Sequence, residues 1–204
     1  MKIAVTGASG LIGSALVPAL RAKGHDVVRF LRSTPQQPDE RPWDPSNRRL
    51  DPAELSDVDA VIHLAGAGVA DTRWTGERKK VILASRVDGT TAVAEAIAAS
   101  GQPKVLLAAS AIGWYGDTGD QVTDETGRCG NGFLADVGRQ WEAATAPAEA
   151  AGVGVAHLRT GSELHSKGGA LANQATVAKP GPGSRLGSRH TWEGWEQPTA
   201  SETR

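Results

Sequence analysis

Short apolar runs alternate with longer stretches of helical hydrophobic spacing along most of the chain. The apolar runs have the length and composition of buried strands, at residues 2–6, 26–31, 60–64, 104–109 and 153–158. Helical spacing predicts helices over 11–23, over 75–100 as one helix or two, and over 133–151. Pro147 must bend or end the last of these. This alternation is typical of α/β proteins with a parallel sheet.

Two segments break the alternation. Residues 33–57 are polar and contain five prolines, which predicts an irregular surface loop. From Pro180 to Arg204, four of 25 residues are hydrophobic, against 39% of the whole chain. A disordered or poorly packed tail is therefore expected there, because so few apolar groups cannot bury enough surface to order a segment.

Composition excludes several classes of function. The net charge of -1 argues against a dedicated nucleic-acid binder, and no apolar run reaches the roughly 18 residues of a membrane span. The single cysteine, Cys129, excludes an internal disulfide and is typical of a reducing compartment, so we expect a cytoplasmic protein. The five histidines lack metal-ligand spacing, and no metal is expected.

A glycine-rich turn follows the first predicted strand and opens the first predicted helix, with the spacing Gly7-x-x-Gly10-x-x-Gly13. This spacing fits a tight turn at Gly7, close approach to a pyrophosphate at Gly10 and helix–strand packing at Gly13. The helix N-terminus would offer free N–H groups to the phosphates of a dinucleotide. The alternative is a turn that binds nothing. The expected cofactor-binding residues of this turn are Thr6, Gly7, Ser9, Gly10, Leu11, Ile12 and Gly13.

The end of the second predicted strand bears on the choice of cofactor. An NAD site places an acidic residue there, on the ribose 2′-hydroxyl. This chain has none between Arg29 and Ser33, whereas Arg32 and Ser33 can hold a 2′-phosphate. The pattern favours NADP(H) over NAD(H), unless Arg29 and Arg32 are merely solvated.

The glycine spacing, together with the strand at 59–66, resembles the short-chain dehydrogenase/reductase superfamily, in its extended and atypical branches. More specifically, the chain resembles the epimerase-family proteins of the 39U type over roughly residues 1–188. The resemblance implies a Rossmann doubly wound parallel sheet, a nicotinamide cofactor and a poorly defined substrate, with Leu64, Ala65 and Gly66 beside the cofactor. The motifs that carry it include Trp43-Asp44-Pro45, Trp74-Thr75, Ser85-Arg86-Val87, Ser110-Ala111-Ile112-Gly113-Trp114-Tyr115-Gly116-Asp117 and Leu158-Arg159-Thr160-Gly161.

The catalytic residues of the superfamily are not reproduced. Its members use Tyr-x-x-x-Lys on one helix, where the Lys lowers the Tyr pKa. The matching helix, 133–142, holds no such pair, and the single tyrosine is Tyr115. Ser110 lies one place from the position of the superfamily's Ser or Thr. We expect Tyr115 and Ser110 to act in catalysis, or Tyr115 merely to pack near the nicotinamide ribose.

Three other polar residues have competing interpretations. Arg86 either meets a cofactor phosphate or substrate acid, or forms a surface ion pair. His63 stands in an apolar run and is interpreted as a core histidine. Cys129 has no neighbouring His or Cys-x-x-Cys partner and is interpreted as a bystander thiol.

The resemblance also predicts the domain organisation. We expect a dinucleotide-binding domain at 1–165, the start of a truncated substrate region at 166–188, and a divergent tail at 189–204. The tail reflects either truncation or a frameshift, or else a natural short variant. An incomplete C-terminal substrate region would leave a sheet edge exposed and permit self-association.

Three functions follow as hypotheses. The first is an NADP(H)-binding oxidoreductase or epimerase-like enzyme with an unknown small-molecule substrate, and no nucleic-acid or membrane partner. The second is a non-catalytic dinucleotide-binding sensor or scaffold. The third is a degenerate fragment without function.

Overall fold

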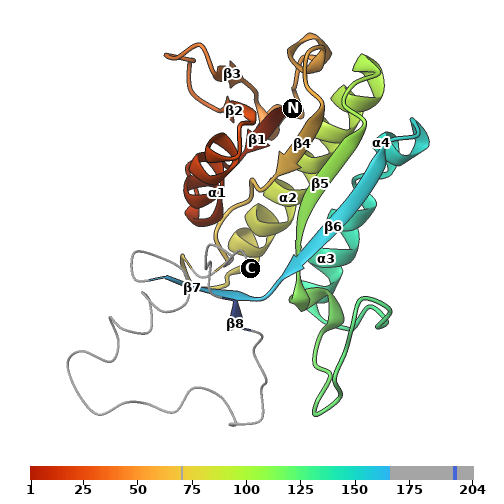
Figure 1. The fold of residues 1–204 in the computed structure, drawn as a ribbon. Coiled ribbons are helices and arrows are strands. Elements are labelled where there is room, and N and C mark those ends of the chain that lie inside the picture. Colours follow the sequence, from red (N-terminus) through yellow and green to blue (C-terminus); the bar gives the residue numbers. More distant parts are fainter. Residues whose placement is uncertain (70, 166–194, 197–204) are drawn as a thin grey trace, which may run out of the picture. The chain divides into compact units, whose positions relative to one another are not determined.

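The computed structural model describes residues 1–69, 71–165 and 195–196. Its centre is strand β1 (Lys2–Thr6), which pairs in parallel with β2 (Asp26–Leu31) on one side and with β4 (Ala60–His63) on the other. The sheet continues outward through β3 (Glu40–Pro42), β5 (Val105–Ala111) and β6 (Gly154–Thr160), in the order β3-β2-β1-β4-β5-β6 (Figure 1). The predicted α/β fold with a Rossmann-like parallel sheet is confirmed.

Strand β3 corrects the prediction of an irregular loop at 33–57. The strand pairs in parallel with β2, and two short 3₁₀ helices follow it at Pro45–Asn47 and Pro52–Leu55. The side chain of Arg29 in β2 donates to Asp39 at 2.7 Å and to Glu40 at 2.9 Å. Backbone pairing and these ion pairs attach β3 to the sheet, and the apolar residues Trp43, Leu50 and Leu55 of the same segment are buried in the core.

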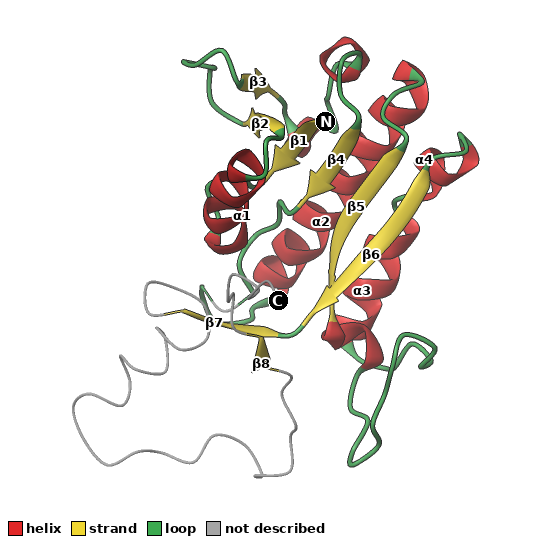
Figure 2. Cartoon of the chain, in the orientation of Figure 1, coloured by secondary structure: helices red, strands yellow, loops and turns green. Residues whose placement is uncertain are grey.

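The helices begin and end where local chemistry permits. Helix α1 spans Leu11–Ala22, and α2 is one continuous helix over Gly76–Ser100. The Thr75 side chain caps α2 by accepting from the Arg78 N–H, and Gly101 ends it with φ +67°. Helices α3 (Phe133–Ala143) and α4 (Ala146–Ala150) replace the single helix expected over 133–151. The break precedes Pro147, as predicted (Figure 2).

Two apolar clusters cover the two faces of the sheet, because successive strand residues point to opposite sides. One face packs against α2, and the other packs against α1 (Figure 1). The first cluster includes Ala4, Phe30, Val61, Leu106, Val93 and Ile97. The second includes Ile3, Val5, Val27, Ile62 and Val17. Burial on both faces explains why the central strands appear in the sequence as continuous apolar runs.

The chain forms two compact units. The first comprises Met1–Ser110 and Arg139–Leu158, and the second comprises the described residues of Ala111–Gly138 and Arg159–Arg204. The second unit contains the parallel pair β7 (Ser162–His165) and β8 (Trp195–Glu196). The domain boundaries expected from the sequence stay predictions, since 166–188 and all of 189–204 except 195–196 lie outside the described residues.

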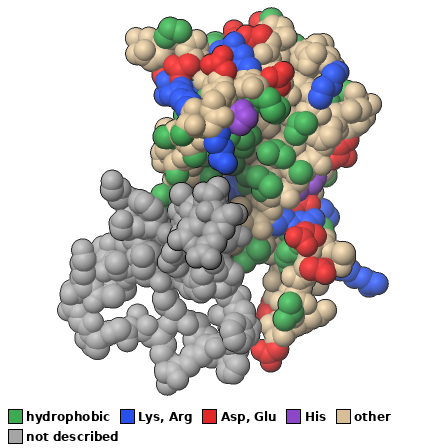
Figure 3. All heavy atoms as spheres, in the orientation of Figure 1, with side chains coloured by type: hydrophobic (Ala, Val, Ile, Leu, Met, Phe, Trp, Pro, Cys, Tyr) green, Lys and Arg blue, Asp and Glu red, His purple; other side chains and the backbone are tan. Residues whose placement is uncertain are grey.

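Surface and helix character add two observations. On the face shown in Figure 3, acidic and basic side chains are interspersed rather than gathered by sign. Of the helices that the structure describes, none combines the length and apolar character needed to cross a membrane.

Candidate functional site

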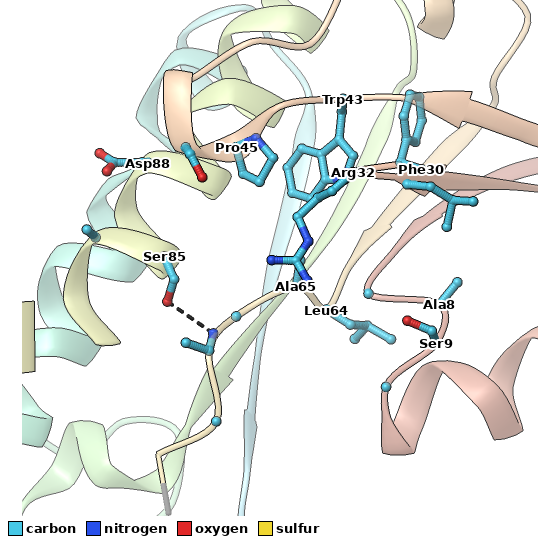
Figure 4. Close-up of a pocket in the computed structure, with 18 of the residues that line it drawn as sticks. Ala8, Ser9, Phe30, Arg32, Trp43, Pro45, Leu64, Ala65, Ser85 and Asp88 are labelled. Atoms are coloured by element: carbon cyan, nitrogen blue, oxygen red, sulfur yellow. Dashed lines mark hydrogen bonds between the residues drawn. The ribbon is translucent and has the colours of Figure 1, made fainter. Parts of the chain in front are cut away.

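A pocket of about 710 Å³ lies where β1, β2 and β4 end. Carboxyl ends of parallel strands are where open α/β sheets bind ligands. One wall is the glycine turn, and the adjoining wall is the turn after β4, from Leu64 to Gly68. Segment 43–46 and one side of α2 complete the lining (Figure 4). Of the predicted cofactor residues, Gly7, Ser9, Gly10, Arg32, Leu64, Ala65 and Gly66 line this pocket.

The glycine turn has the geometry that its spacing predicts. Gly7 adopts φ +67°, and a Cβ atom there would lie 2.9 Å from the Ala65 nitrogen. A Cβ atom at Gly13 would lie 2.3 Å from the Gly7 carbonyl oxygen, so only glycine allows α1 to pack this closely. The predicted tight turn and helix–strand packing are confirmed, whereas pyrophosphate binding at Gly10 stays a prediction.

The first turn of α1 is open to an anion. Gly10 occupies the N-cap position without a side-chain hydrogen bond, and the first turn contains no acidic residue. The backbone N–H groups at the start of a helix have no intrahelical acceptors and carry partial positive charge. Leu11 and Ile12 occupy the first two positions of this helix, and their binding of a cofactor stays a prediction.

The two arginines near the end of β2 differ in their partners. Arg29 is held by Asp39 and Glu40, and its hydrogen bond lowers the pKa of the Asp39 carboxyl to about 2. Arg32 lines the pocket, and Figure 4 shows its side chain reaching from the end of β2 toward the middle of the cavity. Within the described part of the chain, no carboxylate pairs with Arg32. Ser33 is exposed beside it.

The turn after β4 is held by α2. The Ala67 N–H donates to the Ser85 Oγ at 3.1 Å, the bond drawn in Figure 4. The Ala67 carbonyl accepts from Arg86 Nη1 at 3.0 Å. The two hydrogen bonds hold the peptide groups on either side of the Ala67 Cα, and so fix this wall of the pocket. The sequence motif Ser85-Arg86 gave no indication of this role for Ser85.

Arg86 is partly buried rather than a surface residue. Its guanidinium also donates to the Ile82 carbonyl and lies 4.9 Å from the centre of the Trp141 ring. Burial, reinforced by the positive charge of Arg78, lowers the pKa of Arg86. No carboxylate among the described residues pairs with Arg86, so the surface ion pair is not formed there. A contact with a phosphate or substrate acid stays a prediction.

The hydroxyl of Ser110 is engaged with a partly buried carboxylate. Ser110 is 2% exposed and donates to Glu142 Oε1 of α3 at 2.6 Å. The other carboxylate oxygen lies 4.0 Å from His157 Nδ1, and His157 Nε2 lies 3.0 Å from the Thr145 hydroxyl. The catalytic role of Ser110 stays a prediction. Glu142 was missed as a partner because it stands 32 residues away on another element.

Tyr115 belongs to the second unit, where Arg159 determines its surroundings. Its hydroxyl accepts a hydrogen bond from Arg159 Nη1 at 3.0 Å. The guanidinium lies 3.7 Å from the centre of the Trp114 ring and 5.1 Å from that of Tyr115. The sequence analysis assigned no role to Arg159, although it stands in a quoted motif. The catalytic role of Tyr115 is untested by these contacts.

Two further residues were interpreted as structural. His63 is fully buried, as expected of a core histidine, and burial lowers its pKa to about 4. The Cys129 thiol lies 3.8 Å from the Ala135 carbonyl oxygen. No group of His, Cys, Asp and Glu side chains suited to a metal ion occurs among the residues that the structure describes.

Comparisons with known proteins agree with this geometry. Epimerase family protein Mb2239 of Mycobacterium bovis is 42% identical over 193 residues, or 95% of this chain and 64% of the relative. The crystal structure of a nucleoside-diphosphate sugar epimerase from Corynebacterium glutamicum is 38% identical, with a TM-score of 0.83, over 97% of this chain and 41% of that one. The structure of human epimerase family protein SDR39U1 (isoform 2) with NADPH is 27% identical, with a TM-score of 0.79, over 97% and 66% of the two chains.

The chain thus spans slightly less than two thirds of the length of Mb2239. The resemblance to the 39U type is confirmed. A family model described as the NAD dependent epimerase/dehydratase family matches residues 3–132, which is more than half of the chain. This chain therefore belongs to the NAD dependent epimerase/dehydratase family.

Proposed function

We propose that this protein binds NADP(H) in the pocket and exchanges hydride with a small carbonyl or sugar-nucleotide-like substrate. The observation that carries the cofactor choice is Arg32, a cation that lines the pocket without a carboxylate partner among the described residues. A 2′-phosphate would give this guanidinium a charge-assisted partner, whereas an unmodified ribose would not. The NADPH in the human SDR39U1 structure supports the choice.

The residues present fit a dinucleotide. Because Gly7 and Gly13 have no Cβ atom, α1 can start close against the end of β1. The backbone N–H groups of its first turn would then face the pyrophosphate. Phe30, Trp43 and Pro45 supply flat apolar surface close to Arg32, which suits a purine. The clamped turn at Ala67 would then face the nicotinamide half. When bound, NADPH supplies the hydride.

On the chain's own side, we assign proton transfer to Tyr115. Its oxygen accepts from Arg159, so its proton remains available to a substrate oxygen. The second candidate is a non-catalytic dinucleotide-binding sensor or scaffold, favoured by the absence of Tyr-x-x-x-Lys from α3. A substrate panel separates the two: turnover that Tyr115→Phe abolishes supports the enzyme, and the absence of turnover with retained NADPH binding supports the sensor.

Fluorescence titration with NADPH and NADH tests the cofactor assignment. We expect Arg32→Ala to weaken NADPH binding by roughly tenfold or more and to change NADH binding by less than about twofold. The matched control is Arg49→Ala, because Arg49 is exposed and lies outside the pocket lining. Tight NADH binding without NADPH preference in the wild type would overturn the assignment.

The proposal also covers the extent of the cofactor-binding domain, the cell compartment and self-association. The cofactor-binding domain extends over residues 1–165, and the protein acts in the cytoplasm, which the single cysteine supports. Copies of the chain associate through the edge strand β6, whose residues alternate between exposed and partly buried. Size-exclusion chromatography across a concentration series tests the association.

A further inference from the structure

The hydroxyl of Thr6 joins the two backbone turns that form adjoining walls of the pocket. Thr6 is fully buried at the end of β1, directly before Gly7. Its Oγ1 accepts from the Ala65 N–H at 3.4 Å and from the Leu64 N–H at 3.2 Å, and the Leu64 N–H is shared with the Thr6 carbonyl oxygen at 3.3 Å. The missing Cβ of Gly7 is what lets these turns touch. The Thr6 oxygen is therefore the side-chain acceptor at their junction.

Counting protons then fixes the state of His63. A threonine hydroxyl has two lone pairs and one proton. Both lone pairs of Thr6 face peptide N–H groups, so its proton must go elsewhere. His63 Nδ1 lies 2.7 Å from Oγ1 and accepts it. The ring is then the neutral tautomer with its proton on Nε2, and burial, which lowers the pKa of His63 to about 4, keeps it neutral.

The other ring nitrogen has no hydrogen-bond partner among the described residues. His63 Nε2 is buried, and the ring meets Trp43 edge to face with centroids 5.9 Å apart. A buried N–H without an acceptor is unfavourable, and an apolar residue of similar size would avoid it. Histidine at this position is therefore explained by what Nδ1 does, since filling the core would favour an apolar side chain.

We propose that His63 is a positioning residue. Its Nδ1 accepts a hydrogen bond from the Thr6 hydroxyl, which leaves the lone pairs of the Thr6 oxygen to hold the Leu64–Ala65 turn against Gly7. The turn lines the pocket, so its order governs cofactor affinity. That last consequence rests on the proposed function. The tautomer and the hydrogen bonds of the turn do not.

A spectroscopic test on the wild-type chain needs no cofactor. Two-bond proton–nitrogen correlation spectra of the full chain report which ring nitrogen of each of the five histidines carries a proton. The His63 signals are assigned by their disappearance in His63→Asn. We expect an unprotonated Nδ1 and a protonated Nε2 at neutral pH. The opposite tautomer, or a ring protonated on both nitrogens, would overturn the proposal.

Paired substitutions test the effect on the pocket. Asparagine places its Oδ1 where Nδ1 stood, so His63→Asn should keep most of the NADPH affinity, while His63→Leu should raise the Kd about tenfold. The amide signals of Leu64 and Ala65 should move in His63→Leu and stay near their wild-type positions in His63→Asn. Equal affinity and equal amide shifts in both variants would contradict the proposal.

A second pair serves where His63→Leu does not fold. Thr6→Ser keeps the hydroxyl and Thr6→Val removes it at nearly constant shape, so the same contrast in amide shifts is expected between them. Identical shifts in the two would refute the role of the Thr6 oxygen. If the wild type binds no NADPH, the proposed function fails, while the tautomer and the amide shifts still decide this inference.

Discussion

Replacing Gly13 by alanine sets the cost of a steric clash against the gain in helix propensity, so the change in stability shows which effect is larger. A Cβ atom at Gly13 would lie 2.3 Å from the Gly7 oxygen, 2.7 Å from the Ala8 Cα and 2.9 Å from the Ala8 carbonyl carbon. All three are backbone atoms, so no side chain can turn away to relieve the contact. Alanine gains up to about 1 kcal/mol in helix propensity, whereas overpacking of this kind costs about 1–3 kcal/mol or more. We expect net destabilisation of roughly 1–2 kcal/mol.

Two other glycines calibrate this value. A Cβ atom at Gly10 would lie 3.2 Å from the Gly7 oxygen, so Gly10→Ala should cost less stability than Gly13→Ala. At Gly76, the first residue of α2, nothing lies within 4 Å of the added atom, and Gly76→Ala should change stability by no more than about 0.5 kcal/mol. The three substitutions are chemically identical, so their ranking isolates the close approach between α1 and the turn.

Urea unfolding followed by circular dichroism measures the three free energies, and NADPH titration measures the effect on the pocket. Since α1 must move away from Gly7, Gly13→Ala should also weaken NADPH binding by more than about tenfold. Wild-type stability in Gly13→Ala, or an equal loss in Gly76→Ala, would refute the packing argument.

Other substitutions probe the buried polar groups. The unfolded imidazole of His63 keeps a pKa near 6.5 and the folded one titrates near 4, so the free energy of unfolding should rise with pH between these values; urea titrations of His63→Asn should show a shallower rise. The hydrogen bond from Arg29 lowers the pKa of Asp39 to about 2, so their pairing stabilises the fold above about pH 4 and is lost toward pH 2. In Asp39→Asn, the free energy of unfolding should fall less between about pH 4 and pH 2, and an unchanged fall would contradict the pairing. Trp141→Phe removes the N–H that donates to the buried Thr90 hydroxyl at 3.0 Å and should cost about 1–2 kcal/mol in urea unfolding, whereas an unaltered stability would mean that this bond contributes nothing.

The central strands and the glycine turn could be predicted because one physical cause dominates each. Burial on both faces makes β1, β4 and β5 mostly apolar, and a glycine at every third position lets α1 start close against the end of β1. Strand β3 has no such cause within itself. Its sequence, Glu-Arg-Pro, is polar and contains proline; its backbone pairs in parallel with β2, and its Glu40 forms an ion pair with Arg29.

The side-chain partners of the site lay beyond prediction, because each depends on an element distant in sequence. Ser110 has a recognisable place at the end of a strand, but nothing in the neighbouring sequence shows that Glu142 will accept the hydrogen bond of its hydroxyl. Arg86 is a cation on a helix, and its environment follows from the Ala67 carbonyl and the Trp141 ring, 19 and 55 residues away in the chain. The spacing of residues in the sequence identifies candidates for a site. Only the packed structure shows which of their polar atoms are already engaged in hydrogen bonds.

The segment that contains Asp39 and strand β3, which the hydrophobic pattern did not predict, determines which of two arginines stays without a carboxylate partner. Arg29 and Arg32 both stand near the end of β2, and on sequence alone Arg32, with Ser33, is expected to hold a 2′-phosphate unless both arginines are merely solvated. Because β3 folds back alongside β2, Asp39 and Glu40 neutralise Arg29 within the strand. Arg32 lies beyond the reach of this pairing and keeps its charge in the pocket. It follows that Asp39→Ala, which removes one of the two carboxylate partners of Arg29 outside the pocket lining, should alter stability more than NADPH preference, whereas Arg32→Ala should do the reverse.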